Sequence, residues 1–284
     1  MDKTIVITGA NAGIGYATAE VLAKEGAHII MYCRSSKRGA AAQKALQAST
    51  GNQAIDLVIG DLGSLESVQR SAAEMHARFD KIDVLINNAG VVTLKKEWTK
   101  DGFEQMMGVN YVGHFELTRL LLPLLKKADR ARIVVVASDA YKFVPDKDQA
   151  FFDVEGFLPW REYGRSKKAM ILMAEAFADQ LRNTDITVNA LHPGAVATSL
   201  GVSRKTGFGK AVYKVLTPFF KTPAQGADTA IYLATSSEVA DISGQYFVDR
   251  QITPLKIPHK NQQMRKLWTQ TQREIADHLN QTIS

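Results

Sequence analysis

TGANAGIG, at residues 8–15, is the stretch that decides the fold. It closes a short apolar run, Ile5–Thr8, and opens a longer segment, Ile14–Glu25, whose apolar residues recur at helical spacing. Glycine permits backbone angles that other residues avoid and lets a ligand approach the main chain closely. The start of the helix offers free N–H groups and positive potential. Strand, turn and helix together predict a site for a pyrophosphate group.

Three glycines, Gly9, Gly13 and Gly15, space this turn as Gly-x-x-x-Gly-x-Gly. The commoner dinucleotide fingerprint is Gly-x-Gly-x-x-Gly, and many loops carry glycine for turn geometry alone. The place of the turn, directly after the first strand, favours the phosphate-binding interpretation.

The rest of the chain repeats this alternation of short apolar runs and longer helical patterns. The predicted strands are Ile5–Thr8, Ile29–Cys33, Leu57–Ile59, Val84–Asn87, Ile133–Ser138, Val188–His192 and Tyr246–Val248. The predicted helices are Ile14–Glu25, Ser64–Phe79, Phe103–Leu125 with a kink favoured at Pro123, and Ser166–Leu181. Repeated β-α-β order predicts an α/β fold, a doubly wound (Rossmann), mostly parallel sheet of seven strands with helices on both faces.

We expect a single dinucleotide-binding oxidoreductase domain over residues 1–284, with a core of about 3–250 and a C-terminal helical extension of about 255–284. A helix is predicted over Asn261–Leu279, packed on its own domain, and docking to a partner subunit stays open as the alternative. Two connections, Asp139–Glu162 and Val196–Thr222, are longer than most loops in compact domains. Such segments are usually lids or binding loops.

The composition is that of an ordinary globular protein, with 45% hydrophobic and 23% charged residues. The formal net charge of +6 is scattered, which argues against a nucleic-acid-binding tail. No apolar run is long enough to span a bilayer, and the N-terminus has no signal-peptide pattern. Cys33 is the single cysteine, which suits a reducing compartment. We therefore expect a cytoplasmic protein without a transmembrane segment or a metal site.

The end of the second predicted strand bears on the choice of cofactor. An acidic residue about 20 positions after the glycine turn would bind the ribose 2′-hydroxyl of NAD. The chain instead has Arg34, followed by Lys37 and Arg38, and no carboxylate. A guanidinium pairs well with a 2′-phosphate, so we expect NADP(H) to be preferred over NAD(H). The alternative is that Arg34 is a solvated loop residue.

Tyr163 and Lys167 stand four residues apart at the start of a predicted helix, which places both side chains on one helical face. A phenol has an ordinary pKa of about 10, and a nearby ammonium favours the phenolate and lowers that pKa. Ser138 ends a predicted strand at the edge of the sheet where ligands bind. Its hydroxyl can hold a substrate oxygen, or it can simply cap a turn.

Polar residues elsewhere have two interpretations each. Asn110 lies within a predicted helix, where asparagine is disfavoured, and can anchor a water that relays protons to Lys167 or bond the local backbone. The stretch Asn87–Gly90 can brace the sheet edge or touch the adenosine ribose. Asp61 can accept a hydrogen bond from adenine or cap the next helix, a role that Ser64 can also fill.

Taken together, these residues resemble the short-chain dehydrogenase/reductase family over about Lys3–Asp249. The markers come in the family's order: TGANAGIG, Asp61, NNAG at Asn87–Gly90, Asn110, Ser138, Tyr163-x-x-x-Lys167, and Pro193–Gly194 with Thr198. The segment DGFEQMMGVNYVGHFELTRLLLPLL is similar to the retinol dehydrogenase branch, which includes relatives such as the WW-domain oxidoreductase. In that branch an arginine in the place of Arg34 goes with NADP(H).

The resemblance implies a mechanism. Tyr163 would be the general acid in reduction and the base in oxidation, with Lys167 lowering its pKa and holding the nicotinamide ribose. Ser138 would position the substrate oxygen, and Asn110 would complete a proton relay. The residues implied to bind the cofactor are Gly9, Asn11, Gly13, Ile14, Gly15, Arg34, Asp61, Leu62, Asn87, Ala89, Gly90, Tyr163, Lys167, Pro193, Gly194, Val196 and Thr198.

The expected reaction interconverts an aldehyde or ketone and an alcohol. Aromatic and apolar residues crowd the two long connections: Phe151, Phe152, Phe157, Leu158 and Trp160 in the first, and Leu200, Phe208, Tyr213, Phe219 and Phe220 in the second. They favour a lipophilic substrate (retinal-like, steroid-like or a xenobiotic carbonyl), with ordinary core or a subunit contact as the alternative. A non-catalytic NADP(H) sensor that acts through a protein partner is the competing function, and a homo-oligomer stays open.

Overall fold

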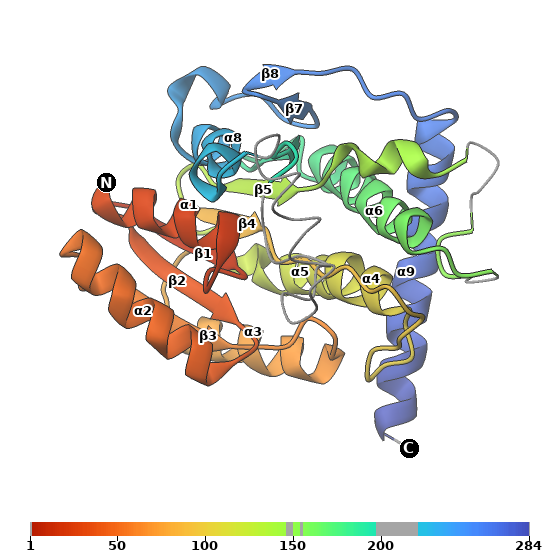
Figure 1. Cartoon of the computed structure of the whole chain (residues 1–284), viewed down its shortest axis with the longest axis horizontal. Helices are drawn as coiled ribbons and strands as arrows, with labels where there is room; N and C mark the ends of the chain where they lie inside the picture. Colours follow the sequence, from red (N-terminus) through yellow and green to blue (C-terminus); the bar gives the residue numbers. More distant parts are fainter. Residues whose placement is uncertain (1, 146–149, 154–155, 197–220, 284) are drawn as a thin grey trace, which may run out of the picture.

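This computed structural model of the chain describes residues 2–145, 150–153, 156–196 and 221–283, of which 280–283 are described by their backbone alone. A single sheet runs through it in the order β3-β2-β1-β4-β5-β6-β7-β8 (Figure 1). Its strands are β1 (Thr4–Thr8), β2 (His28–Cys33), β3 (Ile55–Ile59), β4 (Val84–Asn87), β5 (Arg132–Val136), β6 (Thr187–His192), β7 (Tyr246–Val248) and β8 (Gln251–Ile252). All neighbouring strands are parallel except β7 and β8, which are antiparallel.

The two faces of the sheet are covered by different helices, because successive strand residues point to opposite faces. On β1, Ile5 and Ile7 pack with α1 (Gly13–Lys24), α2 (Ser36–Thr50) and α8 (Pro223–Thr235). Val6 packs on the other face with α3 (Leu65–Arg78), α5 (Gly113–Leu125) and α6 (Pro159–Gln180). The strands are buried on both sides, which explains their nearly continuous apolar sequence.

The predicted doubly wound fold is confirmed, and so are the seven predicted strands. The two-residue β8 adds an eighth strand, which is too short to leave an alternation pattern in the sequence. The helices α2 and α8 were not predicted. Helix α2 is rich in alanine and lysine and buries few large side chains, so its apolar periodicity is weak.

The helix predicted over Phe103–Leu125 is interrupted well upstream of Pro123. The short α4 (Gln105–Met107) is followed by a π-helix, η1 (Gly108–Val112), and only then by α5, which keeps Pro123 within it. A π-helical turn inserts one extra residue into the helix and often marks a functional site.

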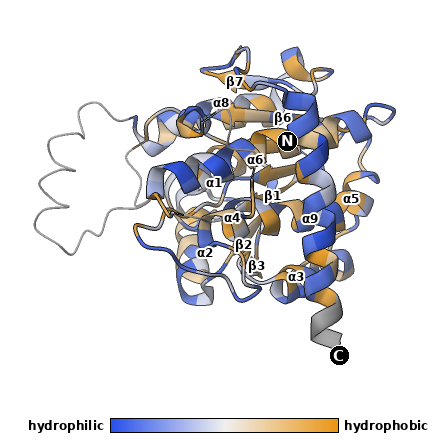
Figure 2. Cartoon of the chain, turned by 90° about the vertical axis from the view of Figure 1, so that its right-hand side faces the viewer, coloured by the Kyte–Doolittle hydropathy of each residue, from blue (hydrophilic) through white to orange (hydrophobic). Residues whose placement is uncertain are grey.

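The C-terminal helix α9 (Lys260–Ile283) extends the predicted Asn261–Leu279 and packs beside α6 (Figure 1). In Figure 2, where its side of the molecule faces the viewer, its ribbon is mostly hydrophilic with separate hydrophobic positions. The inward positions meet an aromatic cluster, in which the Trp268 ring lies 4.7 Å from Phe115 and 5.0 Å from Phe177. Within the described residues, no helix is both long enough and apolar enough to cross a membrane.

Candidate active site

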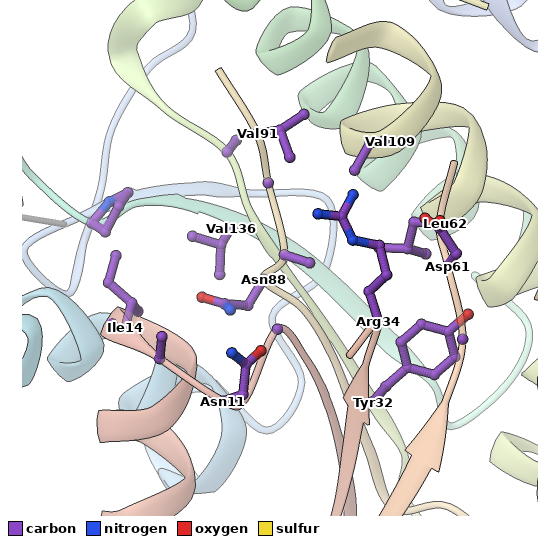
Figure 3. A pocket seen from close by; sticks show the side chains of 18 of the residues that line it. Asn11, Ile14, Tyr32, Arg34, Asp61, Leu62, Asn88, Val91, Val109 and Val136 are labelled. Atoms are coloured by element: carbon purple, nitrogen blue, oxygen red, sulfur yellow. The ribbon is translucent and has the colours of Figure 1, made fainter. Parts of the chain in front are cut away.

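A cavity of about 290 Å³ opens at the carboxyl edge of the sheet, beyond the ends of β1 to β6 (Figure 3). Twelve of the predicted site residues line it: Gly9, Asn11, Gly13, Ile14, Arg34, Asp61, Leu62, Ala89, Gly90, Tyr163, Lys167 and Pro193. Parallel strands bring their carboxyl ends to one edge, so segments that are distant in sequence meet there. The cavity therefore joins the glycine turn to the Tyr163–Lys167 pair.

The glycine turn is tight and packs against the loop that follows β4. Gly9 and Gly13 have φ angles of +70° and +59°, which favour glycine. A Cβ on Gly15 would lie 2.5 Å from Asn88 Nδ2 and 2.7 Å from the Gly9 carbonyl oxygen. Gly15 does not line the cavity, and its missing side chain instead lets α1 approach this loop.

Helix α1 begins at the cavity without a side-chain cap. Its N-cap residue is Ala12, whereas Ser35 caps α2 and Ser64 caps α3 with their hydroxyls. Ala12, Gly13 and Ile14 all line the cavity. A helix start with unpaired N–H groups and a positive dipole end, placed in a cavity of this kind, fits the phosphates of a dinucleotide.

Two arginines line the same cavity beyond the end of β2. Arg34 is exposed, and its side chain extends alongside Leu62 toward Val109 (Figure 3). Arg38 lies in the first turn of α2, and sequence reasoning had not included it. Among the described residues, no ion pair holds either guanidinium. Both are therefore available to an anionic ligand in the cavity.

The two interpretations of Asp61 are separated by its contacts. Ser64 caps α3, since its hydroxyl accepts from the Ser67 N–H at 3.4 Å. The Asp61 carboxylate accepts from the Gly63 N–H at 2.9 Å and closes the turn after β3. Asp61 thus lines the cavity without capping the helix.

The two asparagines at the end of β4, Asn87 and Asn88, brace the sheet. Asn87 Nδ2 donates to Thr118 Oγ1 in α5 at 2.9 Å, so this side chain is buried and does not line the cavity. Asn88 Nδ2 donates to the Thr8 carbonyl at 2.7 Å, and the Asn88 and Ala89 N–H groups donate to Thr8 Oγ1 at 2.8 and 2.9 Å. Asn88 lines the cavity although it was missing from the predicted set, and its place inside the NNAG motif is the signal that could have added it.

Asn110 lies in the π-helix η1 and is fully buried. Its Oδ1 accepts from the Val91 N–H at 2.7 Å, and its Nδ2 donates to the Val91 carbonyl at 3.1 Å and to Ser166 Oγ at 3.0 Å. A Cβ on Gly90 would lie 3.5 Å from Asn110 Oδ1 and 3.7 Å from Lys167 Nζ. Asn110 therefore holds the loop beside the cavity against α6, and its role in a proton relay stays a prediction.

Tyr163, Lys167 and Ser138 come together although they belong to different segments. Ser138 lies two residues beyond β5, where its hydroxyl caps the 3-10 helix η2 (Asp139–Phe143) through the Ala140 N–H and also bonds the Tyr163 phenol. Lys167 Nζ donates to the Val136 carbonyl at 2.9 Å and lies 5.7 Å from the centre of the Tyr163 ring. The Ser138 side chain can thus both cap η2 and lie where it could hold a substrate oxygen.

Burial shifts the pKa values of both Tyr163 and Lys167. Burial raises the pKa of Tyr163 to about 12, and the hydrogen bond from Ser138 only partly opposes this. Burial also lowers the pKa of Lys167 to about 7. Desolvation of the phenolate therefore dominates the Tyr163 pKa in this structure, and the role expected of Lys167 stays a prediction.

The remaining predicted residues lie outside the cavity or outside the described residues. Gly194 and Val196 follow β6 and contact Lys221, but neither lines the cavity. Thr198 and the apolar residues Leu200, Phe208, Tyr213, Phe219 and Phe220 fall within 197–220, outside the described part of the chain.

The aromatic residues of the first long connection do not line the cavity either. Phe151 is buried in the core, and Phe152 packs 5.9 Å from Phe103. Leu158 and Trp160 are exposed. An apolar wall is supplied instead by valines that the sequence did not single out: Val91, Val109 and Val136.

Known proteins resemble this chain along most of its length. A sequence model of the family described as "short chain dehydrogenase" matches residues 3–207. Human retinol dehydrogenase 14 is 41% identical over 94% of this chain and 84% of its own length. Human retinol dehydrogenase 13 is 37% identical over 96% of this chain and 85% of its own length.

Solved structures show the same architecture. A short chain dehydrogenase from Escherichia coli CFT073, complexed with NADPH, superposes with a TM-score of 0.68 at 26% identity, over 87% of this chain and 95% of that one. Levodione reductase superposes with a TM-score of 0.72 at 20% identity, over 87% of this chain and 95% of that one, and this likeness concerns the fold alone.

Proposed function

Because the chain belongs to the short-chain dehydrogenase family, and is thus an oxidoreductase that acts on CH–OH groups with NAD(P), we propose that it prefers NADP(H) and acts on a lipophilic carbonyl–alcohol pair. The observation that carries the proposal is a single cavity whose lining includes the uncapped start of α1, Arg34 and Tyr163. That arrangement suits a dinucleotide whose reactive ring reaches an acid–base group.

Arg34 and Arg38 support the preference for NADP(H). Both line the cavity beyond β2, where a carboxylate would otherwise select the ribose hydroxyl of NAD. A guanidinium bonds a phosphate with two N–H groups at once and keeps its charge at every physiological pH. Two relatives of known structure are complexed with NADP or NADPH, which agrees with the proposal.

The catalytic roles follow from the contacts around Tyr163. When bound, NADP(H) supplies or accepts the hydride. In reduction the Tyr163 phenol donates its proton to the carbonyl oxygen, and in oxidation the same oxygen takes a proton from the alcohol. Ser138, whose hydroxyl donates to the phenol in this structure, would turn that one proton to the substrate oxygen and so place it. Lys167, once protonated, stabilises the phenolate from one helical turn away.

A lipophilic substrate is supported by two observations. The lining includes apolar side chains, among them Val91, Val109 and Val136. The similar human proteins carry the name retinol dehydrogenase. We therefore propose long-chain or polyene aldehydes and alcohols as the substrate class, with retinal and retinol as the first compounds to test.

The test is NADPH oxidation with a panel of aldehydes and ketones, in parallel with NADH. We expect turnover of apolar carbonyls and a higher kcat/KM with NADPH than with NADH. Tyr163→Phe removes the acid and should lower kcat by about 10²- to 10⁴-fold while NADPH still binds. NADPH binding without turnover of any compound would instead favour the sensor function, and a preference for NADH would reject the proposed cofactor.

A further inference from the structure

Four titratable side chains gather around the end of β5 and the neighbouring strands β6 and β7, next to the proposed catalytic Ser138. Asp139 follows Ser138 directly, and Lys142 lies one turn later in η2. His192 is the last residue of β6, and Tyr246 is the first residue of β7. We call these four residues the Asp139 cluster. None of them lines the cavity.

Asp139 is held from three sides. Its Oδ1 accepts from the Tyr246 hydroxyl at 2.9 Å, and its Oδ2 accepts from Lys142 Nζ at 2.6 Å. Its backbone N–H donates to His192 Nδ1 at 3.3 Å. The side chain and the main chain of one residue are thus tied to η2 and to both strands that follow β5 in the sheet. Because Ser138 precedes Asp139 by one peptide bond, these contacts also limit where the Ser138 hydroxyl can lie.

The bond to His192 needs a neutral imidazole, since Nδ1 accepts a hydrogen bond only when it carries no proton. Burial lowers the pKa of His192 below its ordinary value, and the charges of Lys142 and Lys221 act in the same direction. The carboxylates of Asp139 and Asp249 oppose them. The neutral form is therefore the stable one near pH 7.

The charge of Asp139 is also maintained by its neighbours. Burial acts to raise its pKa, but hydrogen bonds from Lys142 and Tyr246 outweigh burial, and the pKa is lowered. Tyr246 remains a neutral donor, because burial and the Asp139 charge both raise its pKa. The cluster therefore has one stable arrangement of protons around neutrality: a carboxylate, an ammonium, a neutral imidazole and a neutral phenol.

We propose that Asp139 is a positioning residue for Ser138 and that a neutral His192 is required to keep Asp139 in place. The proposal rests on the reductase function above, because it concerns the placement of that reaction's serine. Protonation of His192 turns an acceptor into a donor that faces the Asp139 N–H. The two donors then repel, and Ser138 moves with the backbone. Turnover falls on the acid side while the cofactor site is left intact.

The first test compares Asp139→Ala with Asp139→Asn, using NADPH and a carbonyl that the wild type reduces. Asp139→Ala should lower kcat by about ten- to a hundredfold, the effect of a small misplacement at a reacting centre. Asp139→Asn keeps an oxygen for the Tyr246 hydroxyl and should recover most of that loss. The NADPH Kd, measured by fluorescence, should stay within about twofold in both variants, since the Asp139 cluster lies outside the cavity.

The second test uses the shape of the histidine side chain. His192→Asn places an amide oxygen where Nδ1 stands and does not titrate, so this variant should stay active and lose the decline of kcat below about pH 6.5. His192→Gln is the matched control, because its oxygen falls near the place of Nε2 and cannot accept from the Asp139 N–H. It should have a lowered kcat across the range of about pH 5 to 8.

The outcomes distinguish this inference from the function on which it rests. A wild type that binds NADPH and reduces no carbonyl overturns the proposed function and this inference with it. An active wild type with a kcat of Asp139→Ala within about twofold of normal overturns the positioning role alone. An acid decline that is the same in wild type and His192→Asn overturns the requirement for a neutral histidine.

Discussion

The polar groups at the cavity edge and those on the face of α9 differ in how well they are stabilised by neighbouring groups. At the cavity, α1 starts without a side-chain cap, and Lys167 is buried with its pKa lowered to about 7. On α9, Thr271 bonds the Tyr111 hydroxyl at 2.7 Å, and Lys260 pairs with Glu175 at 2.9 Å. Trp268 fills the space between helices with its ring edges against other aromatic rings.

The difference shows where stability and function separate in this fold. A buried amine and an uncapped helix start at a cavity reduce stability and are kept where a ligand will bond them. Groups that are paired and packed against a helix face raise stability and touch no ligand. Substitutions at the cavity edge should therefore remove activity without unfolding the protein. Substitutions on α9 should lower stability and leave the activity of the folded protein unchanged.

The largest effect is expected for Lys167→Met. We expect kcat to fall by about 10²- to 10⁴-fold, because the ammonium that stabilises the Tyr163 phenolate is lost. The same change should raise Tm by about 4 °C near neutral pH, since a buried amine is replaced by an apolar side chain of similar length. Kinetics and calorimetry on the same preparation would measure the change in kcat and the change in Tm. A variant that is both inactive and less stable would contradict the idea that Lys167 serves activity at the expense of stability.

The sign of the stability change can be tested with pH. The folded state lowers the pKa of Lys167 from 10.5 to about 7, so over this interval the unfolded chain holds a proton that the folded chain has released. Stability of the wild type therefore rises with pH across that interval, and Lys167→Met lacks this rise. The Tm advantage of the variant should shrink from about pH 7 toward about pH 10.

Trp268→Ala is the corresponding change on α9. Removing this ring from between Phe115 and Phe177 leaves a cavity and should reduce the free energy of unfolding by about 3–5 kcal/mol. The kcat measured well below the new Tm should stay within about twofold of the wild type, because Trp268 does not line the cavity. Trp98→Ala, at a ring that is 54% exposed, is the control and should change stability little. A loss of kcat without a loss of stability would show that α9 acts on the site.

Arg34→Ala should have a smaller effect, confined to one cofactor. A charge-assisted bond to the 2′-phosphate contributes about 1.5–3 kcal/mol, so kcat/KM with NADPH should fall by about ten- to a hundredfold. With NADH, which lacks that phosphate, it should change by less than about twofold. Lys37→Ala removes a nearby positive charge from the first turn of α2, at a side chain that does not line the cavity. Equal losses in the two variants would mean that general charge, and not Arg34, attracts the cofactor.

Much of the cavity could be predicted because its parts are contiguous in the sequence. The glycine turn, Arg34 and the Tyr163–Lys167 pair each follow from a short motif and its place after a strand or at a helix start. Parallel strands then bring these motifs to one edge without any further information. The sheet was predictable for the same reason, since seven of its strands are short apolar runs between helical patterns.

Other features depend on contacts that no local pattern reveals. Asn110 was assigned to a regular helix, yet it lies in a π-helical turn whose side-chain bonds reach Val91 and Ser166. Arg38 lines the cavity only because α2 starts immediately after β2, and α2 itself lacks an apolar stripe. The burial that raises the Tyr163 pKa could not be predicted, because spacing along a helix does not determine how deeply a side chain is buried.

The smallest predicted effects concern substitutions at the N-termini of α1 and α3. Helices α1 and α3 both begin beyond the carboxyl edge of the sheet, but the Ser64 hydroxyl caps α3, whereas the N-cap residue of α1, Ala12, has no side chain that can cap it. Ser64→Ala should lower the free energy of unfolding by about 1 kcal/mol and leave kcat and the NADPH Kd unchanged. Ala12→Ser is the matched change at α1. A hydroxyl there can accept from the N–H groups that line the cavity, so the variant should gain thermal stability and bind NADPH more weakly. Tighter NADPH binding by Ala12→Ser would show that the free N–H groups of α1 do not hold the cofactor.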